Sequence, residues 1–193
     1  MKTQIIIALR FLAAMTLLTG IIYPFFMTGV AQITFPEKAN GSLILKNGKI
    51  IGSELIAQKF DSTIYFWSRP SAIGYNPIPS GASNYGPTSK ALKKQVEDRR
   101  VTFASRNSIT DSATIPLEMI FASASGLDPH ISPKAALMQV DRVVKARLFN
   151  TEKKQQILNM ITKLSEGPQF SFFGDDRINV LDLNLELDKL NSK

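Results

Sequence analysis

The sequence contains no cysteine and only one histidine, His130. Without cysteine there is no disulfide scaffold, no zinc site with thiolate ligands and no thiol nucleophile. A single histidine excludes a metal site that needs several histidines from one chain. No segment of 20–50 residues recurs, which argues against a stacked repeat protein. These absences remove much familiar hydrolytic, redox and metal-dependent chemistry.

Charge is also missing from a long stretch near the start of the chain. Residues 11–31 contain no charged side chain, and about 20 apolar residues cross a bilayer as a helix. A buried core helix of this length normally keeps a polar face. The sequence therefore predicts a transmembrane helix within residues 1–31. A cleaved signal peptide is the alternative, because Gly29-Val30-Ala31 resembles a cleavage site.

The first basic residues suggest an orientation for this helix. Lys2 and Arg10 lie on its N-terminal side, and no acidic residue precedes Glu37. Positive residues favour the cytoplasmic side of a membrane. We therefore expect a cytoplasmic N-terminus and an extracytoplasmic domain over residues 32–193.

Small or kinking residues recur at every fourth position of the apolar stretch, at Thr16, Gly20, Pro24 and Thr28. On a helix these residues form one narrow stripe, and small side chains let a second helix approach closely in lipid. Pro24 has no N–H for the Gly20 carbonyl, which predicts a kink. We expect this stripe to pack against a helix of a partner protein.

The remaining chain reads as one α+β domain. Helices are predicted over residues 52–60, 89–105, 132–149 and 151–164 and in a short tail containing Leu187 and Leu190, and residues 101–105 are also compatible with a strand. Strands are predicted over residues 64–67, 117–122 and 178–183. Ser132 and Thr151 are predicted helix N-caps. Because the strands are few and short, the pattern does not predict a doubly wound sheet.

Two long loops interrupt these elements. Residues 68–87 contain seven glycines and prolines, too many for a helix or a central strand. Tyr65, Trp67, Tyr75 and Tyr85 indicate that this loop is packed rather than disordered. Residues 123–131 form a second turn-rich loop. A loop as long as residues 68–87, without a helix or strand of its own, is usually functional or disordered in a folded domain.

Neither loop carries a complete catalytic motif. Residues 81–90 have the Gly-x4-Gly spacing of a phosphate-binding loop, but Pro87 replaces the required lysine and removes a backbone N–H. His130 is the one conventional neutral-pH base, and Asp128 is placed to orient its ring. A turn shaped by this pair is the simpler interpretation. The sequence contains no G-x-S-x-G elbow.

Charged residues gather in two regions. Residues 90–106 contain six basic and two acidic side chains, which we interpret as a solvated helix face rather than a nucleic-acid site, because a membrane anchor precedes the domain. Acidic residues gather near the C-terminus, at Asp175, Asp176, Asp182, Glu186 and Asp188, with Arg177 among them. This second patch is better suited to meet cations.

Several ordered motifs resemble the KdpC family, the C subunit of the Kdp-type potassium-transporting P-type ATPase. The longest are Phe66-Trp67-Ser68-Arg69-Pro70-Ser71-Ala72, Ser80-Gly81-Ala82-Ser83-Asn84-Tyr85-Gly86-Pro87 and Ala122-Ser123-Ala124-Ser125-Gly126-Leu127-Asp128-Pro129-His130-Ile131-Ser132-Pro133. Together with shorter matches they cover nearly the whole chain. The sequence departs from the family where glycine is common, at Ser68, Ala82 and Ala124, and at Asp175-Asp176, where a Glu-Pro-like pair is common.

The resemblance implies an accessory subunit with no catalytic residue and no metal or cofactor of its own, in the bacterial inner membrane. ATP and K⁺ would be handled by its partners, a channel-like potassium-translocating subunit and a P-type ATPase subunit, with membrane lipid as the third contact. The chain itself lacks the D-K-T-G phosphorylation motif and a T-V-G-Y-G filter. The resemblance implies docking or functional roles for eleven residues. They are Gln58, Trp67, Arg69, Ser71, Asn76, Ser80, Ser83, Asn84, Ser125, Asp128 and His130.

Three hypotheses follow from the sequence. The first is a non-catalytic assembly subunit whose polar loops, residues 66–87 and 122–133, hold the outer domain against its partner. The second is a membrane-anchored hydrolase that uses His130 and Asp128. The third, which the family descriptions suggest, is a catalytic chaperone that raises ATP affinity through Gln58 or residues 81–90. The third hypothesis conflicts with the predicted topology, because ATP binds in the cytoplasm.

Overall fold

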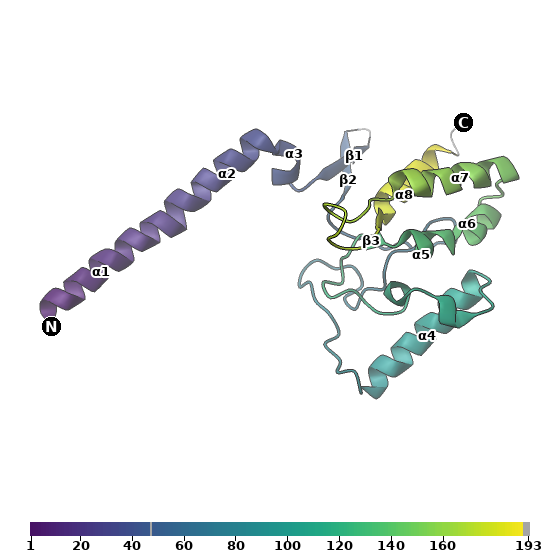
Figure 1. Cartoon of the computed structure of the whole chain (residues 1–193), viewed down its shortest axis with the longest axis horizontal. Coiled ribbons are helices and arrows are strands. Elements are labelled where there is room, and N and C mark those ends of the chain that lie inside the picture. Colours follow the sequence, from purple (N-terminus) through teal and green to yellow (C-terminus); the bar gives the residue numbers. More distant parts are fainter. Residues whose placement is uncertain (47, 191–193) are drawn as a thin grey trace. The chain divides into compact units, whose positions relative to one another are not determined.

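The computed structural model describes residues 1–46 and 48–190 and divides into two compact units, Met1–Ile51 and Gly52–Lys193, called unit 1 and unit 2 below. Figure 1 labels their elements. Helices combine with two small two-stranded sheets, so the fold is α+β as predicted. The predicted domain boundary after residue 31 stays a prediction.

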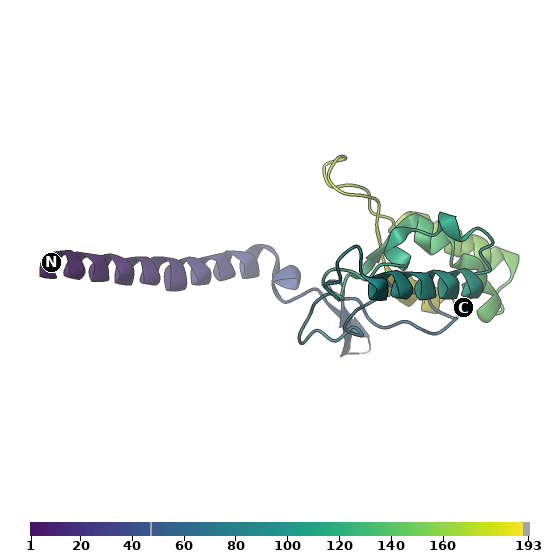
Figure 2. The same cartoon turned by 90° about the horizontal axis from the view of Figure 1, so that it is seen from below.

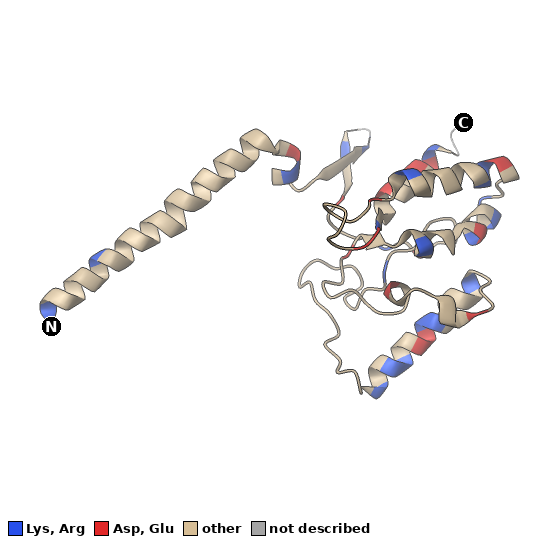
Figure 3. Cartoon of the chain, in the orientation of Figure 1, with Lys and Arg blue, Asp and Glu red and all other residues tan. Residues whose placement is uncertain are grey.

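Unit 1 is dominated by one helix, formed by α1 (Lys2–Leu17), the π-helical turn η1 (Leu18–Ile22) and α2 (Tyr23–Thr34). This helix of 33 residues has a mean hydropathy of 2.3 over its most apolar window and is long and apolar enough to cross a membrane. None of its residues is buried within the described chain. Figure 3 shows how few charged residues it carries.

The irregular turn in this helix lies directly before Pro24. Because proline has no N–H, the Gly20 carbonyl has no donor four residues later, and the residues from Leu18 to Ile22 adopt π-helical bonding. Thr28 donates its hydroxyl to the Pro24 carbonyl at 2.8 Å. The predicted kink therefore coincides with a local change of helix type. Unit 1 ends with α3 (Pro36–Ala39) and a hairpin of β1 (Leu43–Lys46) and β2 (Lys49–Ser53).

Unit 2 contains five α-helices among its described residues. They are α4 (Lys90–Arg106), α5 (Pro133–Leu137), α6 (Val140–Ala146), α7 (Thr151–Leu164) and α8 (Val180–Lys189), with short 3₁₀ turns η2 (Ser112–Thr114) and η3 (Leu117–Met119). β3 (His130–Ile131) and β4 (Ile178–Asn179) form an antiparallel pair in which Ile131 faces Ile178. α7 packs against α5, α6 and α8.

Polar side chains cap the helices of unit 2. Ser89 accepts a hydrogen bond from the Leu92 N–H at the start of α4, and Ser132 accepts one from the Ala135 N–H at the start of α5. Ser132 and Pro133 therefore occupy the predicted capping and first positions. The predicted cap Thr151 is wrong by one residue, because Asn150 caps α7 through the Lys153 N–H.

The core of unit 2 forms where apolar helix faces meet. Val96 and Phe103 are two turns apart on α4, and Ile157 and Ile161 are one turn apart on α7; all four are buried. Phe66, just before the long loop, is fully buried among them. Tyr65 and Trp67 pack against this core, as predicted, whereas Tyr85 is exposed.

Several predicted elements are wrong. Residues 54–60 form turns rather than a helix, and residues 64–67 join no ladder. The predicted strand over residues 117–122 contains the 3₁₀ turn η3 and no strand. Residues 101–105 belong to α4, which confirms the predicted helix and not its strand alternative. A short apolar run indicates that its side chains are buried, but it does not fix the backbone conformation. That conformation depends on the elements that pack against the run.

Two further predictions are only partly correct. The single helix predicted over residues 132–149 is split into α5 and α6. At the break the Gln139 N–H donates to the Ala136 carbonyl, three residues back, and the Gln139 side-chain amide donates to the Ala135 carbonyl. The final strand predicted over residues 178–183 is two residues long. Asn179 ends it by accepting hydrogen bonds from the Leu181 and Asp182 N–H groups, which starts α8.

Candidate functional site

The two loops that the sequence marks for docking lie against each other in unit 2. The Ser123 N–H donates to the Pro70 carbonyl at 3.1 Å, and the Gly81 N–H donates to the Ser125 carbonyl at 3.0 Å. Gly126 has φ of +71°, and a Cβ there would lie 2.5 Å from Ile73 Cγ1. Only glycine allows both this backbone conformation and this close approach. Residues 66–87 and 122–133 therefore form one joined surface, called the loop platform below.

At the start of this platform, two buried side-chain amides make the backbone hydrogen bonds that a neighbouring strand would otherwise make. The Asn184 amide on α8 accepts from the Phe66 N–H at 2.8 Å and donates to the Phe66 carbonyl at 2.9 Å. The Gln139 amide does the same for Trp67, at 2.8 and 3.4 Å. Both amides are at most 2% exposed. Each side chain thus supplies the donor and acceptor that a paired strand would offer.

Arg142 completes the attachment from α6. Its guanidinium donates to the carbonyls of Thr63 and Tyr65 at 2.6 and 2.9 Å, to Asn107 Oδ1 at 2.9 Å and to Gln139 Oε1 at 2.7 Å. It also lies over the Trp67 ring, 4.1 Å from its centre. Burial lowers the pKa of Arg142 to about 10, which leaves it charged at neutral pH. Two of these four hydrogen bonds hold the segment before the platform, and the other two join Arg142 to Asn107 and Gln139.

Arg69, Asp128 and His130 form the polar centre of the platform. Arg69 Nη1 lies 2.7 Å from Asp128 Oδ2, and the His130 N–H donates to Asp128 Oδ1 at 3.0 Å. Burial raises the pKa of Asp128, but hydrogen bonds from His130 and Arg69 and the charge of Arg69 outweigh it and lower the pKa to about 2. The His130 ring lies farther away, with Nδ1 3.6 Å from Asp128 Oδ1. Asp128 thus uses Oδ2 to join the two loops through Arg69 and Oδ1 to shape its own loop through the His130 N–H.

A charged cleft of about 640 Å³ opens beside this centre. It is lined by residues of both charge signs, including Glu118, Lys134, Asp175, Asp176 and Arg177. Ser132 Oγ contributes the lining hydroxyl, but it donates to Glu118 at 2.6 Å and caps α5. A nucleophile positioned by His130 is therefore not formed by the described lining residues, and the cleft gives the hydrolase hypothesis no support.

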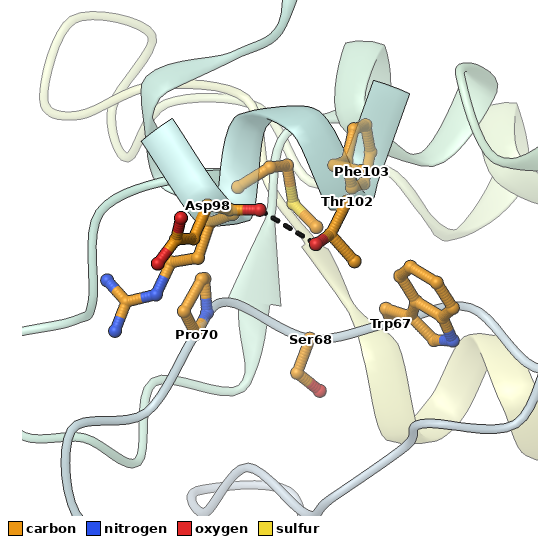
Figure 4. A pocket seen from close by; sticks show the side chains of 8 residues that line it. Trp67, Ser68, Pro70, Asp98, Thr102 and Phe103 are labelled. Atoms are coloured by element: carbon orange, nitrogen blue, oxygen red, sulfur yellow. Dashed lines mark hydrogen bonds between the residues drawn. The ribbon is translucent and has the colours of Figure 1, made fainter. Parts of the chain in front are cut away.

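A second, more apolar pocket of about 260 Å³ lies between α4 and the platform (Figure 4). Trp67, Pro70 and Phe103 supply apolar walls, and Asp98 and Thr102 lie at one side. The Thr102 hydroxyl donates to the Asp98 carbonyl at 2.7 Å, which satisfies it within the helix. The pocket therefore combines apolar walls with the charged side chains of Asp98 and Arg99.

The structure uses several predicted site residues as turn formers. Ser71 accepts from the Ile73 and Tyr75 N–H groups, and Asn76 accepts from the Ile78 N–H. Ser125 accepts from the Leu127 N–H. The Tyr75 hydroxyl donates to the Arg69 carbonyl at 2.8 Å, and burial raises its pKa. These side chains set the shape of the platform.

The other predicted residues are placed less centrally. Gln58 packs beside Gly52, where a Cβ would lie 2.3 Å from its Nε2, and its carbonyl accepts from Ser68. Ser80 and Asn84 are exposed, and Ser83 is half-buried. The stripe of Thr16, Gly20, Pro24 and Thr28 belongs to unit 1 and is exposed.

In residues 81–90, the segment with phosphate-loop spacing, some backbone N–H groups are already paired within the chain. The Gly81 N–H is paired with Ser125, the Ser89 N–H with the Gly86 carbonyl, and Pro87 has no N–H. A phosphate cradle needs several such groups turned toward one anion. Three of the ten positions in residues 81–90 therefore offer no backbone N–H to an anion, which disfavours a nucleotide phosphate there.

Sequence reasoning missed the residues that attach the platform. Arg142 and Asn107 were not singled out, and Gln139, Arg147 and Asn184 belong to the shorter motif matches, to which no role was assigned from the sequence. Arg147 donates to the Ile64 carbonyl at 2.7 Å and pairs with Asp188 at 2.8 Å. Polar residues on otherwise apolar helix faces were the available signal.

The acidic patch near the C-terminus is partly used inside the fold. Asp188 is paired with Arg147 and Tyr65, and Glu186 with Lys189. Burial raises the pKa of Asp182, and the negative charges of Glu54, Glu166 and Glu186 raise it further. Asp175 and Asp176 remain exposed. The patch is therefore not one continuous acidic surface.

Comparison with known proteins agrees with this architecture. The profile of the KdpC family, described as the K⁺-transporting ATPase c chain, matches residues 5–189. A potassium-transporting ATPase KdpC subunit of Geotalea uraniireducens is 46% identical over 187 residues, which covers 95% of this chain and 96% of the relative. The corresponding subunits of Leptospira interrogans and Polynucleobacter asymbioticus are 46% and 44% identical and cover 94% and 97% of this chain, and 92% and 99% of those relatives. The chain with the amide-anchored loop platform therefore belongs to the KdpC family.

Proposed function

We propose that this chain is a non-catalytic accessory subunit of an ATP-driven, high-affinity potassium uptake complex in the bacterial inner membrane. Its partners are a channel-like potassium-translocating subunit and a P-type ATPase subunit, and it supports their assembly and ATP-coupled import. The observation that carries this proposal is the family match over residues 5–189, which includes both the apolar helix and the loop platform.

The loop platform supports a docking role rather than a catalytic one. Its polar groups are engaged in shaping and attaching the loops, as Asp128 and Ser71 show. A surface already rigid before binding loses little conformational entropy when a partner docks. The same commitments disfavour direct nucleotide binding by residues 81–90.

The helix of unit 1 supports membrane docking. A Cβ at Gly20 would have Thr16 Cγ2 at 4.0 Å as its nearest neighbour, so a larger side chain meets no obstacle within this chain. A defect caused by Gly20→Leu must then come from a neighbouring molecule. A Cβ at Gly29 would meet nothing within 4 Å, and Gly29 lies outside the stripe, which makes Gly29→Leu the matched control.

The first experiment is a mild-detergent pull-down from potassium-starved cells, together with growth at limiting potassium. The wild-type chain should recover both partner chains and restore growth to a deletion strain. Gly20→Leu should reduce recovery about tenfold, because small-residue faces permit close packing, whereas Gly29→Leu should not. Recovery of the wild-type chain without either partner would overturn the proposal.

The proposed topology has a separate test, because the chain has no native cysteine. Ser80→Cys and Thr3→Cys each place one thiol at an exposed position. A membrane-impermeant maleimide should label Ser80→Cys from outside the inner membrane and label Thr3→Cys only after lysis. The reverse pattern would place unit 2 in the cytoplasm.

A further inference from the structure

A protruding hairpin in unit 2 has a tip that the platform does not use, although Asp175, Asp176 and Arg177 at its base line the charged cleft beside the platform. Glu166 and Arg177 exchange backbone hydrogen bonds at 2.8 and 2.9 Å, and Gln169 and Phe173 do so at 2.8 and 2.9 Å. Figure 2 shows this segment between α7 and α8 as a loop projecting away from the helices. We call residues 166–177 the projecting hairpin.

The tip of the projecting hairpin is aromatic and exposed. Phe170, Phe172 and Phe173 are 84%, 69% and 59% exposed. The rings of Phe172 and Phe173 touch each other with centres 4.1 Å apart, so the tip presents a small cluster of aromatic surface. Exposed apolar patches of this kind mark interaction sites when they are not scattered singly.

The turn at the tip does not account for these residues. Phe170 and Ser171 have φ of +53° and +67°, and the Phe172 N–H donates to the Gln169 carbonyl. A turn with two positive φ values favours Asn-Gly, and phenylalanine is a poor residue for it. The hairpin therefore carries Phe170 at a cost to its own turn.

The charge around the tip distinguishes a lipid surface from a protein surface as its binding partner. Glu166, Asp175 and Asp176 are exposed at the base of the hairpin, and Arg177 pairs with Glu166 at 3.0 Å. Residues 165–176 contain no lysine or arginine. Segments that bind an anionic bilayer surface combine apolar residues with basic ones. The acidic base therefore disfavours lipid and favours a protein surface with the opposite charge.

We propose that the phenylalanine tip inserts into an apolar pocket on another subunit of the same complex, with lysine or arginine residues at the pocket rim facing Asp175 and Asp176. The inference rests on the proposed function, because it requires a multi-subunit complex. None of the residues predicted from the sequence as docking sites lies in this tip.

Site-specific photo-crosslinking in the full complex tests this contact. Phe170→benzoyl-phenylalanine should crosslink to one partner subunit. Leu148→benzoyl-phenylalanine is the control, because Leu148 is 92% exposed in the turn after α6 and lies outside the hairpin. A crosslink to lipid only, no protein crosslink from position 170, or equal yield from position 148 would overturn the contact while the wild-type complex still co-purifies. Loss of co-purification by the wild type would instead refute the proposed function.

Charge reversal tests the basic rim. Asp175→Lys combined with Asp176→Lys should reduce the crosslink yield from position 170 about tenfold at low salt, because like charges at an interface are strongly unfavourable. Glu152→Lys, at an exposed position on α7 outside the hairpin, is a control that changes the charge in the same direction and should leave the yield unchanged. An unchanged yield in the double variant would refute the basic rim.

Discussion

The long helix of unit 1 and the loop platform of unit 2 satisfy their backbones in opposite ways. In residues 2–34 the backbone bonds are made within the helix, and the side chains remain exposed. Residues 54–89 contain no helix or strand, and distant side chains such as Gln139 and Asn184 supply their partners. A helix of this kind suits lipid, whereas the platform depends on one tertiary arrangement. Substitutions should therefore act locally in unit 1 and cooperatively in unit 2.

The largest effect is expected at Arg142. Arg142→Met removes four hydrogen bonds and leaves the Thr63 and Tyr65 carbonyls without this donor, which should lower the free energy of unfolding by about 4 kcal/mol. Urea unfolding of the detergent-solubilised chain, followed by Trp67 fluorescence, measures it. Lys145→Met, at an exposed position on the same helix, should change it by less than about 0.5 kcal/mol. Equal effects would show that the platform is not anchored by Arg142.

Asn184 should come next. Asn184→Leu keeps a similar volume but leaves the buried Phe66 N–H and carbonyl unpaired, with an expected loss of about 3 kcal/mol in the free energy of unfolding. Asn159→Leu on the exposed face of α7 is the control, and its loss should stay below about 1 kcal/mol. A small loss at Asn184 would mean that residues 54–89 are held by other contacts.

Two glycines with positive φ separate crowding from backbone strain. Gly126→Ala brings a Cβ within 2.5 Å of Ile73, whereas Gly174→Ala meets nothing within 4 Å. We expect a loss of about 3 kcal/mol for Gly126→Ala and about 1 kcal/mol for Gly174→Ala by the same unfolding measurement. Similar values would contradict the close approach of the two platform loops.

Asp128 should make the platform sensitive to acid. Its pKa is lowered to about 2 in the folded chain, so its contribution is complete above the unfolded pKa near 3.8 and is lost as the pH falls toward 2. The stability difference between wild type and Asp128→Asn should shrink by about 1–2 kcal/mol between pH 5 and pH 2. A difference independent of pH would show that Arg69 and His130 do not stabilise the charged form.

The smallest effect on folding belongs to unit 1. Gly20→Leu should change the unfolding of unit 2 by less than about 0.5 kcal/mol, because the nearest side chain to the new Cβ is that of Thr16 in the same helix, at 4.0 Å. Trp67 fluorescence reports this unfolding. A large change would show that the stripe residues support this chain rather than a partner.

Prediction from the sequence succeeded where the signal was local. The apolar helix, α4, α7 and the Ser132 cap follow from composition, periodicity and capping residues. It failed for the short apolar runs at residues 64–67 and 117–122, because a few buried residues fit a strand, a turn or an extended segment equally well. It located the platform loops through their motifs but not the side chains that attach them.

The order of residues is enough to specify a membrane-length helix, a charge distribution and two rigid loop motifs, because each depends on neighbours within a few positions. Only the packing of the whole unit shows that Arg142, Gln139 and Asn184 make the backbone hydrogen bonds that a neighbouring strand would make to residues 65–67. These residues lie 72 to 118 positions from the backbone groups they bind. Such hydrogen bonds depend on distances and directions that exist only after the helices pack.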